Sequence, residues 1–246
     1  MRTTALARVA LFFLLALAGS AVAQIDARSQ ALLDGLMQDQ QAAAVETLDQ
    51  TMVMTMYSGG TETVSSTRTV IDYVNRRAVI FTDLGEGMMA RLVHVDGVTT
   101  MRMEGMPMAI PVPPGMGSAF DAIFDPAQTL SDDPDATAVY DGQVSYGDLV
   151  SGQQVTYTAS YDVMGTSTES TSRFVFDEAG ELLATISDGT DGSLTVMVFD
   201  PPTSDSPYVG RGSTMYDFKD GAATVTAVTR YENVVVNQPL DETLFQ

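Results

Sequence analysis

The spacing of apolar residues changes from a helical to a strand period near residue 45. Between Asp26 and Gln40 the apolar positions recur at i, i+1, i+4 and i+5, which is the stripe of an amphipathic helix. They are Leu32, Leu33, Leu36 and Met37. Asp26 is suited to accept hydrogen bonds from the free amides of the first turn. We therefore predict an N-terminal helix over about 26–40.

From Leu48 onward apolar and polar residues alternate, in segments rich in Val, Ile, Thr, Tyr and Met. This period of two predicts strands. The first five run over Leu48–Tyr57, Thr61–Val74, Arg77–Leu84, Met88–Val95 and Val98–Met108. Their connections are short, and Asp96-Gly97 is the pair that a two-residue hairpin turn favours. Because a parallel crossover needs a dozen or more residues, these strands are expected to form an antiparallel meander.

A proline-rich insertion from Pro111 to Pro134 interrupts the strands. Within it, apolar residues recur at i, i+4, i+7 and i+8, a helical spacing. They are Met116, Phe120, Ile123 and Phe124. A long insertion with its own apolar helix is often functional, so we predict a helical lid. The alternative is a crossover helix that plugs one end of a sheet.

The second half of the chain returns to strand patterns. The candidates are Thr137–Tyr146, Gln154–Tyr161, Ser172–Asp177, Leu182–Ser187, Leu194–Phe199, Gly212–Phe218 and Ala223–Val236. Asp141-Gly142, Asp188-Gly189, Asp191-Gly192 and Asp220-Gly221 are turn signals. The pattern predicts a mainly β (α+β) fold in a single domain over residues 24–246.

Methionine is concentrated in the first half of this predicted sheet. Ten of the fifteen methionines lie between residues 52 and 116. Met52, Met54 and Met56 are two apart, as are Met101 and Met103, so each set is expected to share one face of its strand. Methionine is flexible and polarisable, which suits either an irregular core or a surface that accepts ligands of variable shape.

The N-terminus has the features of a secretory signal peptide over residues 1–23. Arg2 and Arg8 are followed by an apolar run, and Ala21-Val22-Ala23 fits a cleavage site after Ala23. The run is shorter than the roughly 20 apolar residues of a transmembrane helix. A lipid-anchored protein would need a cysteine, and the sequence has none. We expect a periplasmic, monomeric protein without a membrane anchor.

The charge balance excludes several classes of partner. The formal net charge is −20, and it becomes −22 once Arg2 and Arg8 are removed. So negative a surface repels nucleic acid and anionic lipid surfaces, and neither is expected as the main partner. The absence of cysteine also excludes disulfides and thiol catalysis.

Catalytic motifs are weak, and we predict a non-catalytic protein without a cofactor. His94 is the sole histidine, and no G-x-S-x-G motif occurs. One metal remains plausible on chemical grounds, because soft thioethers select copper(I). Its candidate ligands would be Met52, Met54, Met101, Met103 and His94.

The C-terminal sequence resembles that of the periplasmic lipoprotein carriers, the LolA-like or outer-membrane lipoprotein-sorting family. These proteins end in a strand followed by Asn-x-Pro-Leu-Asp-x-x-Leu-Phe. The matching residues are Asn237, Pro239, Leu240, Asp241, Leu244 and Phe245. The segment Val93–Thr99 is similar to the family's strand, Asp-Gly turn and strand. Arg76 and Arg77 lie where these carriers have an arginine, but the proline that usually follows is absent, so no arginine latch is assigned.

The resemblance implies an incomplete antiparallel β-barrel around a hydrophobic cavity, with helices as a lid. It implies a carrier for lipoprotein acyl chains or lipids, loaded by an inner-membrane release complex and emptied by an outer-membrane acceptor. The expected cavity residues are Met52, Met54, Met56, Met101 and Met103, with Met116, Phe120, Ile123 and Phe124 from the lid. A copper(I)-binding protein and a ligand-free sensor or scaffold are the alternatives.

Overall fold

A single large antiparallel sheet dominates the computed structural model. The structure describes residues 26–42, 45–83, 89–103, 110–112, 120, 124, 136–163, 166–189, 192–201 and 211–246. The first strands are β1 (Thr47–Ser58), β2 (Thr61–Asp72), β3 (Arg77–Asp83), β4 (Met89–Val95), β5 (Val98–Met103) and β6 (Ile110–Pro111). The others are β7 (Thr137–Tyr146), β8 (Val150–Val163), β9 (Thr166–Phe176), β10 (Leu182–Asp188), β11 (Leu194–Phe199), β12 (Ser213–Lys219) and β13 (Ala222–Val236).

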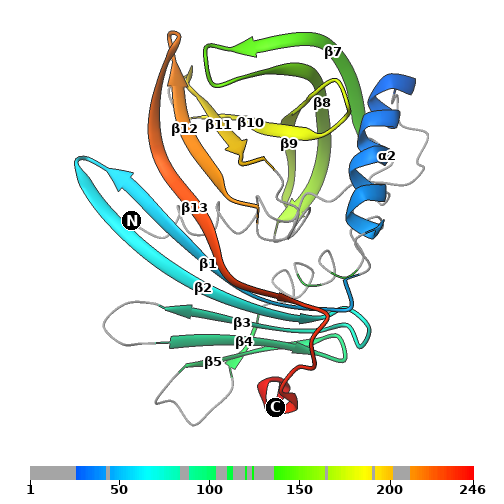
Figure 1. Cartoon of the computed structure of the whole chain (residues 1–246), viewed down its shortest axis with the longest axis vertical. Coiled ribbons are helices and arrows are strands. Elements are labelled where there is room, and N and C mark those ends of the chain that lie inside the picture. Colours follow the sequence, from blue (N-terminus) through cyan, green and yellow to red (C-terminus); the bar gives the residue numbers. More distant parts are fainter. Residues whose placement is uncertain are drawn as a thin grey trace.

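The strand order follows the chain except at one place, where the two halves meet. Across the described sheet the order is β6-β5-β4-β3-β2-β1-β13-β12-β11-β10-β9-β8-β7. The first and last strands therefore pair in the middle of the sheet, and β6 and β7 are its edges. Figure 1 shows the sheet bending through the molecule as an open half-barrel. The predicted fold class is confirmed.

The hairpin turns have the backbone that their sequences predict. Asp96 and Gly97 have φ of 52° and 74°, and Asp220 and Gly221 have φ of 53° and 79°. Positive φ at both central residues matches the right-handed twist of the flanking strands. These turns fix the register of β4 with β5 and of β12 with β13.

Three predictions in the second half are wrong in detail. Asp141-Gly142 is not a turn but lies inside β7, where the pairing with β8 shifts register. Beside this shift the Asp141 carboxylate accepts a hydrogen bond from the side-chain amide of Gln154 (2.7 Å). Strands β8 and β9 also begin earlier than predicted, at Val150 and not Gln154, and at Thr166 and not Ser172. Gly152 does not end the strand: a Cβ there would lie 2.2 Å from the Phe176 carbonyl oxygen, so glycine permits this close approach.

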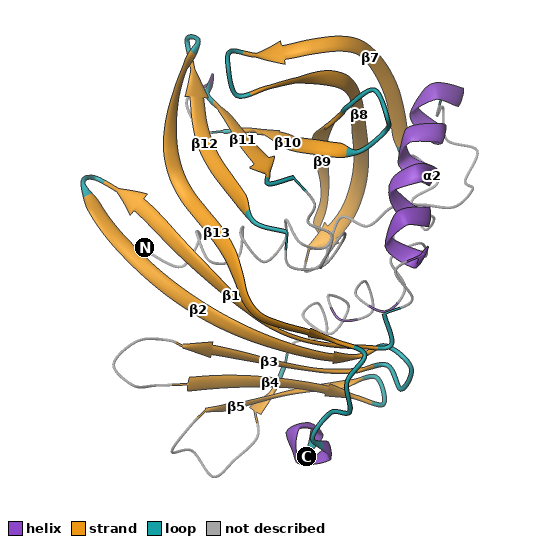
Figure 2. Ribbon diagram, in the orientation of Figure 1, coloured by secondary structure: helices purple, strands orange, loops and turns teal. Residues whose placement is uncertain are grey.

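The predicted helix is present as α2 (Ala27–Ala42). Asp26 caps it: its Oδ1 accepts from the amides of Arg28 and Ser29, both at 3.0 Å. Leu32 and Leu33 are buried against β7–β9, in a cluster with Ala138, Val155, Tyr157, Phe174 and Phe176. Figure 2 shows the helix alongside these strands. The side chains of Leu36 and Met37 lie outside the described residues.

Replacing Asp26 with alanine should cost about 1 kcal/mol of stability. Hydrogen bonds from the Ser29 hydroxyl and amide lower the Asp26 pKa from 3.8 to about 2. A lowered folded-state pKa means that the carboxylate stabilises the folded protein above pH 4 and loses this effect as the pH falls toward 2. Urea unfolding of both proteins should therefore show a difference at pH 6 that narrows at low pH. A difference that stays constant with pH would contradict this role.

The other face of the first half is covered by the C-terminus. Strands β2, β3 and β4 contribute Val70, Val79 and Val93 to this face, and Phe245 of the 3-10 helix η2 (Glu242–Phe245) packs against them. In Figure 1 the C-terminus lies below β3–β5. The tail and α2 thus pack against different parts of the sheet.

Candidate functional site

Most of the described methionines lie on the face of the sheet on which α2 and Phe120 pack; we call it the helix-side face. Directly opposite residues of paired strands share a face, so rows can be followed across the sheet. One row runs from β1 to β8 through Met56, Ala227, Met215, Met197, Thr185, Phe174 and Val155. It ends at Phe174 and Val155, which are in the cluster that packs against α2.

A second row places methionines of β1 and β5 on this same face. It runs through Met52, Thr67, Thr82, Ala90 and Met103. Met54 and Met101 belong to neighbouring rows of the face. Met54 is 5% exposed, whereas Met52, Met56, Met101 and Met103 are half-buried. The pairing therefore brings the five methionines predicted from the sequence onto one face, and their ligand-binding role stays a prediction.

Phe120 and Phe124 of the predicted lid lie over the β1–β4 end of this face. Phe120 is 4% exposed and packs with Leu48, Ile71 and Ala78. Its ring stacks on His94, with centroids 5.0 Å apart, and Arg76 lies 5.6 Å from the centroid of Phe124. Met116 and Ile123, the other predicted lid residues, lie outside the described residues.

His94 is held in this aromatic cluster. It is 3% exposed, and its Nδ1 lies 2.9 Å from the Thr99 hydroxyl on β5. The strand order also bears on the five-residue copper set, because β2, β3 and β4 separate β1 from β5. Four strand spacings amount to about 19 Å along a flat sheet, which weighs against Met52 and Met103 sharing one ion.

The sequence interpretation missed Met197 and Met215. Both lie on the helix-side face, in the row that contains Met56. Alternation alone assigns each to one side of its own strand. The side of β11 and β12 that shares a face with the β1 methionines depends on the pairing of β1 with β13. No local sequence signal predicts that pairing.

Among the described residues, two half-buried side chains of the helix-side face have a buried polar atom without a hydrogen-bond partner. The two atoms are Oε1 of Gln50 and Oγ1 of Thr185. Gln50 lies between Leu48 and Met52 on the same side of β1, and Thr185 lies opposite Met197. Burial also raises the pKa of Tyr231, which is opposite Met52, so this tyrosine stays neutral at physiological pH. The face therefore combines methionines and other apolar side chains with uncharged polar ones, among them Thr67 and Thr82.

The tail motif that carried the family resemblance serves to anchor the C-terminus. Arg77 donates to both carboxylate oxygens of Glu242 (2.6 and 2.7 Å) and lies 4.3 Å from the centroid of Phe245. Arg77 also donates to Asp72 at 2.8 Å. Burial works to raise the pKa of Asp72, but hydrogen bonds from Asn75 and Arg77 outweigh it and the pKa is lowered. Arg76 and Arg77 thus contact different partners, the Phe124 ring and the tail.

Solved structures of other proteins are similar to this chain over most of its length. A DUF1329 family protein from Desulfovibrio piger is 14% identical with a TM-score of 0.54, and the match covers 89% of this chain and 97% of that one. A LolA superfamily protein from Nitrosomonas europaea is 10% identical, with a TM-score of 0.52 and the same coverage. The fold is LolA-like. This confirms the resemblance predicted from the tail, at the level of fold.

A third solved structure also has a similar fold. A putative outer-membrane lipoprotein-sorting protein domain from Vibrio parahaemolyticus is 12% identical with a TM-score of 0.51, covering 86% of this chain and 94% of that one. No protein-family model and no curated protein matches the sequence. Among the described helices, none has the length and apolarity needed to cross a membrane.

Proposed function

We propose that this LolA-like protein is a periplasmic, non-catalytic carrier that binds acyl chains of lipoproteins or lipids and moves them toward the outer membrane. The observation that carries the proposal is the shared face of the methionines. Met52, Met54, Met56, Met101 and Met103 lie on the side of the sheet where α2 and Phe120 also pack. An inner-membrane donor and an outer-membrane acceptor would be its partners.

The half-buried methionines suit an acyl chain physically. Each buried CH₂ group contributes about 0.8 kcal/mol, so a long chain gains most on an apolar surface that adapts to its path. Methionine side chains supply such a surface because they have three rotatable bonds and a polarisable sulfur. Met52, Met56 and Met215 retain exposed area that a ligand could cover. Met116 and Ile123 of the insertion are proposed to contribute from the lid.

The two polar atoms without a hydrogen-bond partner favour one chemical class of cargo. Gln50 Oε1 can only accept a hydrogen bond, and the Thr185 hydroxyl can donate or accept. A buried polar group without a partner costs about 1–3 kcal/mol. A cargo with an amide N–H or a hydroxyl near its acyl chain would remove this cost, whereas a plain hydrocarbon would not.

Native mass spectrometry of the protein purified from its own periplasm, followed by solvent extraction, tests the proposal. The expected result is an adduct that extraction identifies as an acyl-containing species. A copper adduct that disappears on substitution of Met52 and Met54 would favour the metal-binding alternative instead. Protein without any adduct, which also fails to bind added acyl probes, would contradict the carrier function and favour a sensor or scaffold.

A further inference from the structure

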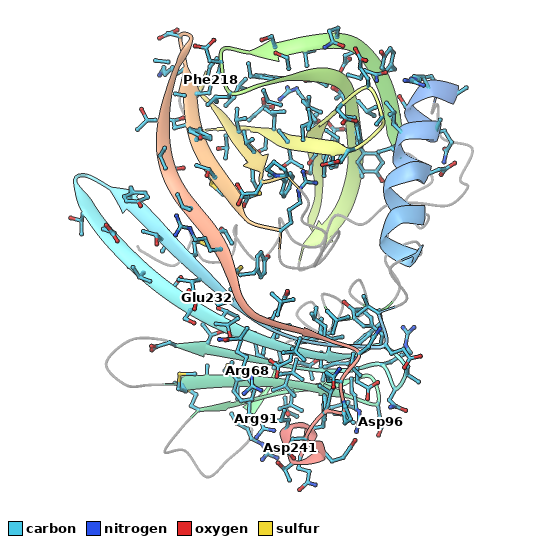
Figure 3. All side chains as sticks on the ribbon, viewed as in Figure 1. Arg68, Arg91, Asp96, Phe218, Glu232 and Asp241 are labelled. Atoms are coloured by element: carbon cyan, nitrogen blue, oxygen red, sulfur yellow. The ribbon has the colours of Figure 1, made fainter. Side chains whose placement is uncertain are left out.

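Arginines gather on the face of β2–β5 opposite to the methionines, in a protein with a net charge of −20. Strand pairing places Arg68, Phe81, Arg91 and Arg102 in one row across β2, β3, β4 and β5. Figure 3 labels Arg68 and Arg91 on these strands and Asp241 on the tail. The partners of the three guanidinium groups differ, and this difference indicates a function.

Arg68 is neutralised within the protein. Its Nε and Nη2 donate to the two carboxylate oxygens of Asp49, at 2.9 and 2.6 Å. Its guanidinium carbon also lies 5.7 Å from the centroid of Phe81. A bidentate pair of this kind uses the charge of both groups, so Arg68 has little capacity for an external anion.

Within the described part of the chain, the partners of Arg91 are all neutral. Its Nη2 donates to the backbone carbonyls of Thr243 (3.3 Å) and Leu244. The guanidinium lies 5.6 Å from the centroid of Phe81, and its buried Nε has no acceptor. Burial, together with the positive charge of Arg102, lowers the pKa of Arg91. Its positive charge is therefore not balanced by a carboxylate among the described residues.

Arg102 lies directly opposite Arg91 and is exposed. In the described part of the chain it makes no hydrogen bond or ion pair. The tail carboxylates are already engaged: Asp241 accepts from the amide and hydroxyl of Thr243, and Glu242 binds Arg77. Like charges directly opposite each other on neighbouring strands are destabilising, so this pair is a place where a bound anion lowers the energy.

We propose that Arg91 and Arg102 form a binding site for a phosphate group on the tail side of β4 and β5. A single arginine can satisfy a carboxylate with two parallel hydrogen bonds. Two guanidinium groups on adjacent strands instead match the larger number of oxygens on a phosphate. Because this face is opposite to the methionines, the phosphate belongs to a molecule other than the bound acyl chain. Inorganic phosphate and a phospholipid headgroup share this chemistry.

The test uses the full mature chain at fixed ionic strength, with two probes. Inorganic phosphate is titrated by calorimetry, and phosphatidylcholine vesicles with and without phosphatidylglycerol are used for co-sedimentation. Arg102→Gln should weaken binding of whichever probe binds by about ten- to a hundredfold, as expected for lost hydrogen bonds to a charged group. Arg102→Lys should recover only part of the affinity, because lysine lacks the planar fork.

Arg230→Gln is the matched control. Arg230 is exposed, lies opposite Val53 and so projects from the same side of the sheet as Arg102, and has no arginine beside it. The Arg230→Gln substitution should leave the binding of both probes unchanged. Equal losses in both variants would indicate a general charge effect and overturn the site, as would wild-type protein that binds neither probe. If the protein binds only the vesicles, the phosphate belongs to a phospholipid headgroup. If it binds inorganic phosphate in solution, the site takes a free phosphate ligand. Binding of an uncharged fluorescent monoacylglycerol, which reports the carrier function, should be unaffected by Arg102→Gln.

Discussion

Met52→Glu should abolish acyl binding, while Val53→Glu should leave it nearly unchanged. Both residues are half-buried neighbours on β1, but they point to opposite faces. Met52 lies on the helix-side face, where an acyl chain would have to cover the new carboxylate. Burying a charge without a partner costs several kcal/mol, which corresponds to a loss of about a hundredfold or more in affinity. Val53 lies opposite Arg230, where a carboxylate is tolerated.

Fluorescence titration with an uncharged monoacylglycerol measures this difference, because an uncharged probe is not repelled by the added glutamate itself. Urea unfolding of both variants provides the control for stability, and the two should unfold at similar concentrations. If Val53→Glu were the variant that lost binding, the acyl chain would lie on the opposite face. If neither variant changed the affinity, the methionines would be part of the core and not of a binding surface.

Phe245→Ala should lower the free energy of unfolding by about 3 kcal/mol and leave acyl affinity unchanged. Phe245 is 8% exposed, packs against Val70, Val79 and Val93, and lies beneath the Arg77 guanidinium. The substitution removes this apolar contact and the cation–π interaction together. The substitution leaves the helix-side face unchanged. Phe245, a residue of the C-terminal motif that resembles the carrier family, is therefore expected to contribute to stability and not to acyl binding.

Phe245→Leu separates the two contributions. Leucine keeps most of the apolar contact and loses only the interaction with Arg77, so its cost should be about 1 kcal/mol. Chemical denaturation gives both values, and monoacylglycerol titration well below the unfolding transition gives the affinities. A variant that retained full stability but lost affinity would show that the tail takes part in binding.

Much of the fold could be predicted from local sequence because local interactions determine it. The helix begins after Asp26 because this side chain caps the first turn, and the Asp96-Gly97 and Asp220-Gly221 turns require residues that tolerate positive φ. Alternation placed Met52, Met54 and Met56 on one side of β1, which the strand pairing confirms. The short connections made the meander antiparallel.

Contacts between segments that are far apart in the sequence could not be predicted from local patterns. Asp141-Gly142 has the sequence of a turn, yet the pairing of β7 with β8 turns it into a register shift within a strand. The tail motif predicted the fold family, but it did not show that Phe245 packs away from the methionines.

The sequence by itself determined the period, the turns and the side of each strand on which a methionine lies. The tertiary structure alone decided which sides of different strands form a common face. Pairing of β1 with β13 joins Met56 to Met215 and Met197 across the centre of the sheet. The physical reason is that a shift of one residue in register moves every side chain to the other face. Where no tight turn joins the strands, as between β1 and β13, the burial of apolar side chains under α2, Phe120 and the tail favours the register that keeps each face intact.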